Sequence, residues 1–175
     1  MNKKYRINLK NKKVLMVSCR LGYNSLLYWD NILSEIKSHS ANLRVFTSFQ
    51  GLETANKKVK TEKVTNGFKY YFKLPFSSYP YLILLPLPLF LIKIKKYKPD
   101  LIILNEFSLS VFYTVFFKFI LGNPKTLLLV ESDPFRGHKN KHSIFRNFIR
   151  KYIVMRCDRI LTNNKLGFNF IVYFL

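Results

Sequence analysis

Residues 98–106, with the sequence KPDLIILNE, constrain the fold of this chain more than any other stretch. Residues 101–104 are four consecutive apolar positions without alternation, which is typical of a strand that is covered on both faces. Pro99 ends the basic segment before this run, and the polar pair Asn105 and Glu106 follows it. Because open α/β sheets bind ligands at the carboxyl ends of their strands, the stretch predicts a central parallel strand beside a cleft.

The rest of the chain alternates between strand-like and helix-like patterns. Apolar runs predict strands at 14–17, 43–46, 126–130 and 158–162, and aromatic residues favour another at 68–74. Apolar residues at helical spacing predict helices at 26–38, 111–121 and 144–153, with a tail at 166–175 that is either helix or strand. The expected caps are Asn24 or Ser25, Ser108 or Ser110, and Ser143. We therefore expect five or six strands in an α/β domain with a Rossmann-like, doubly wound and mainly parallel sheet.

Two segments between these elements are harder to place. Residues 50–66 are rich in Lys, Thr, Glu and Asn, which predicts a solvated excursion. Residues 79–92 are the most apolar stretch, but 14 positions broken by three prolines are too few for a membrane-spanning helix, which needs about 20. We expect a proline-bent loop there that becomes the crossover helix before residue 101.

The chain is strongly basic, with a net charge of +21 from 30 Lys and Arg residues against 9 Asp and Glu residues. Such a charge predicts an anionic partner, although a general compositional bias toward Lys, Asn, Ile, Phe and Tyr explains it equally well. Residues 1–12 form a basic leader before a domain at 13–175, because the apolar run that follows is too short for a signal peptide. Cys19 and Cys157 lack metal-ligand or disulfide spacing and are interpreted as buried thiols in a reducing compartment.

Few residues carry a recognisable chemical motif. A P-loop and a G-x-G-x-x-G motif are both absent from the sequence, and Gly22 after the first predicted strand is a weak phosphate signal that a simple turn also explains. His138 and His142 have metal-like spacing, but they flank lysines without an obvious third ligand, which favours a solvated loop. No metal site is therefore expected.

The scarce acidic residues are more informative. Glu106, Glu131 and Asp133 each follow a predicted buried strand, so they should gather at the carboxyl edge of the sheet. That edge suits hydroxyl recognition or base catalysis. The alternative is helix capping, or ion pairing with Arg20, Arg136 or a lysine.

Four stretches taken in order resemble the amino-terminal half of GT-B glycosyltransferases of the family 4 kind, which build cell-surface polysaccharides and glycolipids. They are KVLMVS at 13–18 with Gly22 after it, KPDLIILNE at 98–106, ESDP at 131–134 and CDRILTNN at 157–164. The resemblance covers about residues 13–174 and implies one half of a GT-B architecture. Many relatives have paired glycines where this chain has Leu21 and Gly22, and a histidine near residues 130–133, so no catalytic residue is carried over.

In that family the amino-terminal domain holds the acceptor, and the carboxy-terminal domain holds the nucleotide sugar. The resemblance therefore implies a truncated or split enzyme that binds a polysaccharide or lipid-linked acceptor, with no cofactor of its own and a second chain as one source of the donor domain. The candidate cleft residues are Arg20, Gly22, Glu106, Glu131 and Asp133.

The basic charge also predicts where such a domain works. We expect a peripheral location at the cytoplasmic face of the inner membrane, with Lys93, Lys95 and Lys96 facing the anionic leaflet. The alternative is a non-enzymatic, membrane-associated basic protein whose segments 79–92 and 107–121 insert in lipid. Specific nucleic-acid binding ranks last, because the sequence shows no recognition module.

Overall fold

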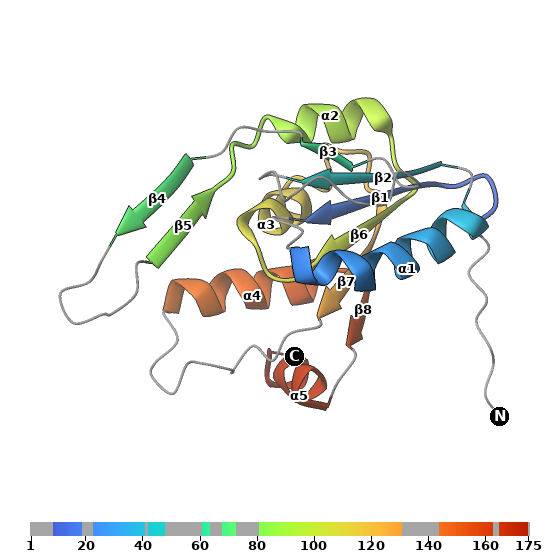
Figure 1. The fold of residues 1–175 in the computed structure, drawn as a ribbon. Coiled ribbons are helices and arrows are strands. Elements are labelled where there is room, and N and C mark those ends of the chain that lie inside the picture. Colours follow the sequence, from blue (N-terminus) through green and yellow to red (C-terminus); the bar gives the residue numbers. More distant parts are fainter. Residues whose placement is uncertain are drawn as a thin grey trace.

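A parallel sheet forms the centre of the molecule (Figure 1). The computed structural model describes residues 9–18, 23–40, 42–47, 61–63, 68–72, 81–130, 144–162 and 165–174. The six strands of this sheet are β1 (Lys13–Ser18), β2 (Asn42–Thr47), β3 (Thr61–Lys63), β6 (Leu101–Asn105), β7 (Lys125–Val130) and β8 (Arg159–Thr162). They lie in the order β3-β2-β1-β6-β7-β8, and every pair is parallel. The predicted Rossmann-like, doubly wound sheet is confirmed.

Helices cover both faces of the sheet, because neighbouring residues of a strand point to opposite sides. Leu33 of the first helix packs with Val14 and Met16 of β1 on one face. Residues of the next three helices pack with Leu15 and Val17 on the opposite face. The helices are α1 (Tyr23–His39), α2 (Phe90–Tyr97), α3 (Leu109–Phe116), α4 (Ile144–Arg156) and α5 (Lys165–Phe174) (Figure 1).

Strand β6 is central, as residues 101–104 predicted. It lies between β1 and β7. Ile102 and Leu104 belong to the cluster under α2 and α3, whereas Ile103 belongs to the cluster under α1. All three side chains are buried, which explains why the sequence shows an unbroken apolar run instead of alternation.

A hairpin corrects one expectation about the middle of the chain. β4 (Phe68–Phe72) is a strand as predicted, but it pairs antiparallel with β5 (Tyr81–Leu85), apart from the six-stranded sheet (Figure 1). The expectation of a proline-bent loop over residues 81–85 is therefore wrong. Pro80 and Pro86 flank the strand and leave five residues between them whose backbone groups can pair with β4.

A second correction concerns residues 50–66, where a solvated excursion was expected. Thr61–Lys63 forms the edge strand β3, paired in parallel with Val45, Phe46 and Thr47 of β2. The many Lys, Glu and Asn residues of this segment disfavour a strand, although its threonines and valines favour one, so the long-range pairing with β2 decides the outcome. The other residues of the segment lie outside the described part of the chain.

Helix ends agree with the predictions in part. Ser108 caps α3, since its Oγ accepts a hydrogen bond of 3.2 Å from the backbone N–H of Val111. The proposed caps at Asn24 and Ser25 are wrong, because α1 already begins at Tyr23. α3 ends at Phe116, five residues earlier than expected, because turn hydrogen bonds replace the helical pattern over residues 117–123. Ser143 lies outside the described residues, and the tail is helical (α5).

Within the described ranges, none of the helices combines the length and the apolar character that crossing a bilayer requires.

Candidate functional site at the carboxyl edge of the sheet

The strand order reverses its direction between β1 and β6. From β1 the chain moves outward to β2 and β3, and from β6 it moves the opposite way to β7 and β8. The helix that follows β1 (α1) packs on one face of the sheet, and the helix that follows β6 (α3) packs on the other. Open α/β sheets bind ligands at such a switch point. Ser18 and Asn105 are the last residues of these two strands.

Ser18 and Asn105 form a buried polar pair. The register that aligns Met16 with Ile103 also places residues 18 and 105 on the same face of the sheet. Asn105 Nδ2 donates a hydrogen bond of 3.1 Å to Ser18 Oγ. Ser18 is 1% exposed and Asn105 is 8% exposed, so little water reaches either group. A side-chain hydrogen bond thus joins the carboxyl ends of the two central strands.

One atom of this pair is left without a partner. Asn105 Oδ1 is buried and accepts no hydrogen bond from any residue in the described part of the chain. Leaving a buried acceptor unsatisfied costs about 1–3 kcal/mol, and native proteins rarely accept that cost without a reason. The atom therefore offers a ready acceptor to a ligand that brings a hydroxyl or N–H donor.

Glu106 turns the chain directly after this pair. Its φ is 59°, in the left-handed region that side chains other than glycine seldom adopt. The backbone N–H of Glu106 donates to the carbonyl of Leu129 at 3.0 Å, which ties the turn to β7. Holding a non-glycine residue in this conformation costs about 1–2 kcal/mol. The strained turn keeps the carboxylate of Glu106 at the edge, half-buried, beyond the end of β6.

Arg150 brings a positive charge from α4 toward the same loop. Its Cζ lies 5.8 Å from the ring centroid of Phe107, the residue after Glu106. The Arg150 side chain is half-buried. Thr47, the last residue of β2, is 3% exposed and pairs in register with Ser18. Neither Arg150 nor Thr47 was named as a candidate site residue from the sequence. For Thr47, as for Ser18, the available signal was a polar residue at the last position of an apolar strand.

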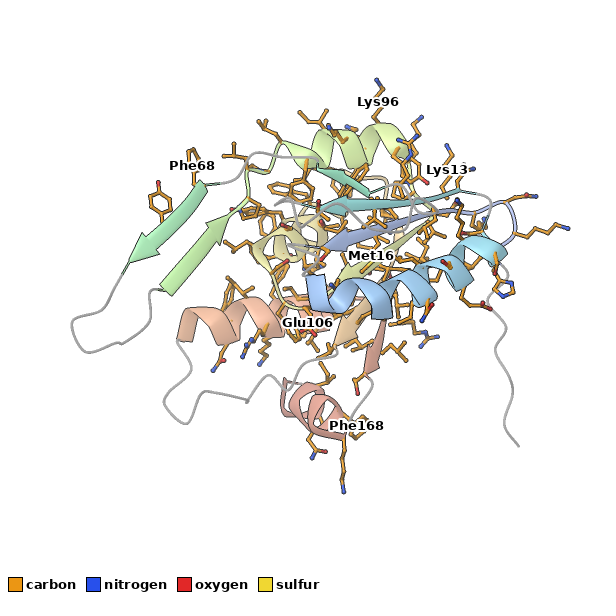
Figure 2. All side chains as sticks on the ribbon, in the orientation of Figure 1. Lys13, Met16, Phe68, Lys96, Glu106 and Phe168 are labelled. Carbon is orange, nitrogen blue, oxygen red and sulfur yellow. The ribbon has the colours of Figure 1, made fainter. Side chains whose placement is uncertain are left out.

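Of the five predicted cleft residues, only Glu106 lies within the described part of the chain. Glu106 lies at the carboxyl edge as expected, and Figure 2 shows it at the opposite end of the sheet from Lys13. Arg20, Gly22, Glu131 and Asp133 lie outside the described residues, as do Cys19, His138 and His142. The gathering of the three acidic residues stays a prediction.

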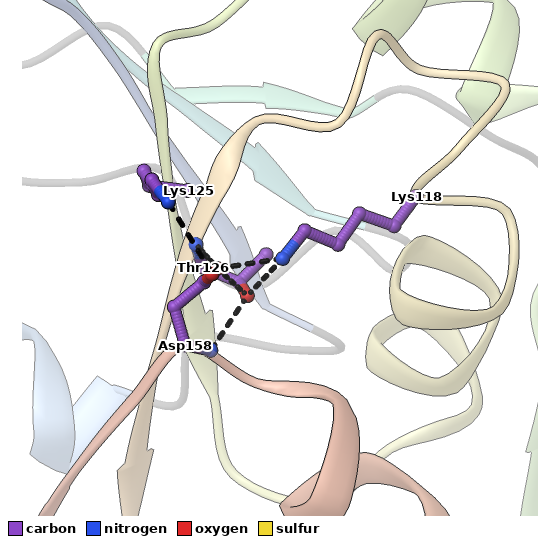
Figure 3. Close-up of polar contacts among 4 residues, drawn as sticks. All are labelled: Lys118, Lys125, Thr126 and Asp158. Carbon is purple, nitrogen blue, oxygen red and sulfur yellow. Dashed lines mark hydrogen bonds and ion pairs between the residues drawn. The ribbon is translucent and has the colours of Figure 1, made fainter.

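At the amino edge, a second polar cluster surrounds Asp158 (Figure 3). Its Oδ2 accepts hydrogen bonds from the backbone N–H of Thr126 at 2.7 Å, from Thr126 Oγ1 at 2.8 Å and from Lys118 Nζ at 2.6 Å. Lys125 Nζ lies 3.8 Å from Oδ1. Burial opposes ionisation, but these partners outweigh it and lower the pKa of Asp158 to about 2. The cluster joins the end of α3 to the starts of β7 and β8.

Asp100 forms a similar but more exposed contact at the start of β6. Its Oδ2 accepts a hydrogen bond of 2.8 Å from the backbone N–H of Lys13, and Lys12 Nζ lies 3.4 Å from Oδ1. The Lys13 bond is the main reason that the pKa of Asp100 is lowered. Both aspartates precede a strand and accept a backbone N–H from the start of the neighbouring strand, so we assign them a structural role.

Cysteine and metal chemistry find no support among the described residues. Cys157 is half-buried against the core and not fully buried as expected, and its burial raises the pKa of its thiol to about 12. A thiol with that pKa stays protonated at neutral pH and is a poor nucleophile. The described residues contain no group of three or more metal-ligating side chains.

The three lysines expected to face a membrane are exposed on α2. Lys93, Lys95 and Lys96 lie on the solvent side of this helix, whose residues Phe90 and Ile94 are buried against the sheet. Two large apolar side chains accompany them at the surface: Leu89 is 62% exposed and Ile92 is 67% exposed.

Comparison with known proteins adds no family to these observations: no protein-family model matches the chain, and no curated protein matches it either.

Proposed function

We propose that this chain is the acceptor-side domain of a GT-B glycosyltransferase of the family 4 kind. Its role is to hold a sugar of a polysaccharide or of a lipid-linked acceptor at the carboxyl edge of the sheet, near the cytoplasmic membrane face. The Rossmann-like fold and the strand order support the proposal, although many unrelated functions share this fold. The site residues therefore carry the argument.

The observation that carries the proposal is the unsatisfied Oδ1 of Asn105. It lies at the position where open α/β sheets bind their ligands, and it accepts no hydrogen bond from the described residues. A sugar hydroxyl supplies the missing donor and accepts from neighbouring groups at the same time. Sites built this way reject ligands that lack the hydroxyl, because the buried polar group is then left unpaired.

The neighbouring residues suit the same ligand. Glu106 brings a carboxylate to the end of β6, where it can accept a hydrogen bond from an acceptor hydroxyl or remove its proton. Arg150 brings a cation to the same loop through its position over Phe107. In this proposal the nucleotide sugar binds to a separate donor domain, so the described residues need no cofactor.

Ligand-observed NMR tests acceptor binding directly. Saturation transfer from the protein to a panel of oligosaccharides and a lipid-linked sugar should identify a binder of the native chain. Asn105→Leu should weaken that binding about tenfold or more, because the buried acceptor is lost. Asn31→Leu, an exposed substitution of the same type on α1, should leave binding unchanged. Equal binding by both variants would contradict the proposal.

Glu106→Gln separates positioning from proton transfer. If Glu106 only accepts a hydrogen bond, the amide should retain acceptor binding within a few fold. If it acts as a base, the variant should bind the acceptor normally but lose sugar transfer when the donor domain is supplied, with a loss of about 10²–10⁴-fold.

A non-enzymatic membrane-associated role is the second candidate, and the surface of α2 favours it. Exposed Leu89 and Ile92 beside three lysines resemble the mixed apolar and basic surface of helices that bind at lipid interfaces. Ile92→Ser should reduce sedimentation with anionic vesicles, whereas Met155→Ser, at an equally exposed apolar residue of α4, should not. Acceptor binding without vesicle binding would rule out this candidate.

A further inference from the structure

A basic cavity lies at the amino edge of the sheet, at the opposite end of the strands from Asn105. It has a volume of about 530 Å³ and opens between the start of β1, the first half of β2 and the helix α2. Figure 2 shows Lys13 and Lys96, from β1 and α2, near the same corner of the molecule. The lining residues are Lys13, Asn42, Arg44, Phe46, Lys93, Lys96 and Tyr97.

The charge of this cavity is one-sided. Four of its lining residues are cationic, and no carboxylate lies among the described residues that line it. Asp100, at the adjacent strand start, directs Oδ2 to the backbone N–H of Lys13 and Oδ1 to Lys12. Positive side chains that converge on one cavity repel one another, and a bound anion relieves that repulsion.

One of the four cations is held in place before any ligand arrives. Arg44 Cζ lies 4.8 Å from the ring centroid of Tyr97, within the range of a cation–π contact. Tyr97 is itself anchored, since its hydroxyl donates to the carbonyl of Asn42 at 3.0 Å and lies 3.4 Å from the carbonyl of Val14. Preorganisation of this kind reduces the entropy lost when a ligand binds.

The charge of the whole chain does not account for this arrangement. Lysines that merely reflect a basic composition lie singly on solvated faces, as Lys95 does on the same helix. Here residues from three elements surround one cavity, with an arginine held on an aromatic ring. Arginine and lysine together are the side chains that proteins use to bind phosphate groups.

We propose that this cavity binds a phosphate group, either of a soluble phosphate or diphosphate or of a lipid headgroup, at a site separate from the proposed acceptor site. The guanidinium of Arg44 contacts the phosphate oxygens, while Lys13, Lys93 and Lys96 add charge around it. No covalent step is involved. A lipid phosphate held here fixes the amino edge of the sheet and α2 against a membrane surface.

Calorimetry with inorganic pyrophosphate and sedimentation with vesicles that contain phosphatidic acid test the two sources. Lys96→Gln should weaken binding about tenfold, whereas Lys95→Gln, the same charge change one residue away but outside the cavity, should change it less than about twofold. Arg44→Lys should also weaken binding about tenfold although the net charge is unchanged. Thermal unfolding of each variant verifies that it folds.

Each outcome has a definite meaning. Pyrophosphate binding without vesicle recruitment assigns the site to a soluble phosphate, and vesicle recruitment that pyrophosphate competes away assigns it to a lipid headgroup. Equal losses for Lys95→Gln and Lys96→Gln, an unaffected Arg44→Lys variant, or no binding of either probe would overturn the proposal. Asn105→Leu should leave phosphate binding intact, so failure of the acceptor site and failure of this site are distinguishable.

Discussion

The polar side chains at the two edges of the sheet make different hydrogen bonds. At the amino edge, Asp158 accepts three hydrogen bonds on one oxygen, and Asp100 accepts one on each of its two oxygens. At the carboxyl edge, Asn105 leaves a buried oxygen without a partner, and Glu106 adopts a left-handed backbone conformation. The two aspartates of the amino edge thus join neighbouring strands, whereas the Ser18–Asn105 pair of the carboxyl edge leaves one acceptor without a partner among the described residues. Left-handed backbone does not distinguish the edges, because Asn11, Lys98 and Asn123 adopt it before strands at the amino edge, and the buried Ser40 Oγ before β2 also lacks a partner in the described part of the chain.

Substitutions that mainly lower stability and substitutions that mainly weaken ligand binding should therefore lie at different edges of the sheet. Fully paired carboxylates join neighbouring strands, so their substitution should mainly lower the free energy of unfolding. At the carboxyl edge, the side-chain link described between strands is the neutral hydrogen bond from Asn105 to Ser18, which contributes less than hydrogen bonds to a carboxylate. Substitution at the carboxyl edge should therefore affect binding more than stability.

The largest effect should come from Asp158→Ala at the amino edge. The change leaves the N–H of Thr126 and the largely buried ammonium of Lys118 without their shared acceptor. We expect the free energy of unfolding to fall by about 2–4 kcal/mol, measured by urea denaturation at neutral pH. A loss below about 1 kcal/mol would mean that the cluster in Figure 3 contributes little to stability.

Lowering the pH tests the contribution of Asp158 to stability in a second way. The pKa of Asp158 is lowered from 3.8 to about 2 in the folded chain, so its contribution is complete above pH 4 and lost as the pH falls through 2. A shift of this size corresponds to about 2 kcal/mol, reduced where solvent screens the partly exposed side chain.

Urea midpoints measured between pH 5 and pH 2 detect this loss. The native chain should lose stability steeply over that range, and Asp158→Asn should show a shallower slope because it cannot titrate. Identical slopes would show that other carboxylates control acid unfolding.

Asp100→Ala should have a smaller effect than Asp158→Ala. The side chains of Asp100 and Lys12 are 43% and 53% exposed, and the one short bond is to the backbone N–H of Lys13. We expect a loss of about 1 kcal/mol or less by urea denaturation, because water replaces most of what the carboxylate provides. A loss as large as that of Asp158→Ala would remove the distinction between the two clusters.

The smallest effect on stability should come from Glu106→Gly at the carboxyl edge. Glycine adopts a φ of 59° without steric cost, but it also increases the entropy of the unfolded chain, so the two terms nearly cancel. We expect a change within about 1 kcal/mol, together with a loss of acceptor binding. Asn123→Gly, with a φ of 53° in the turn after α3, is the matched control and should retain acceptor binding.

Much of the fold was predictable because buried strands have recognisable apolar patterns in the sequence. The unbroken run at 101–104 reflects a strand that is covered on both faces, and residues 14–17 and 126–130 became β1 and β7 for the same reason. Two short strands were not predicted. The strands over Thr61–Lys63 and Tyr81–Leu85 depend on partners elsewhere in the chain, and neither segment shows an alternating pattern.

The sequence predicted where the candidate site lies but not the side-chain contacts within it. The carboxyl edge followed from parallel strands, and Glu106 was named correctly as a residue of that edge. The pairing of Asn105 with Ser18, the unsatisfied Oδ1 and the position of Arg150 were not foreseen. Each depends on the side-chain geometry of residues that are far apart in the chain, so no local pattern reports it.

Local pattern thus established the class of this protein: an α/β chain with buried parallel strands and a strongly basic surface. Such properties are read from neighbouring residues, because hydrophobic periodicity reflects burial directly. Only the folded chain decided the strand order, and with it the meeting of residues 87 positions apart at Asn105 and Ser18. It also decided the convergence of Lys13, Arg44 and Lys96 on one cavity, since long-range packing sets these contacts.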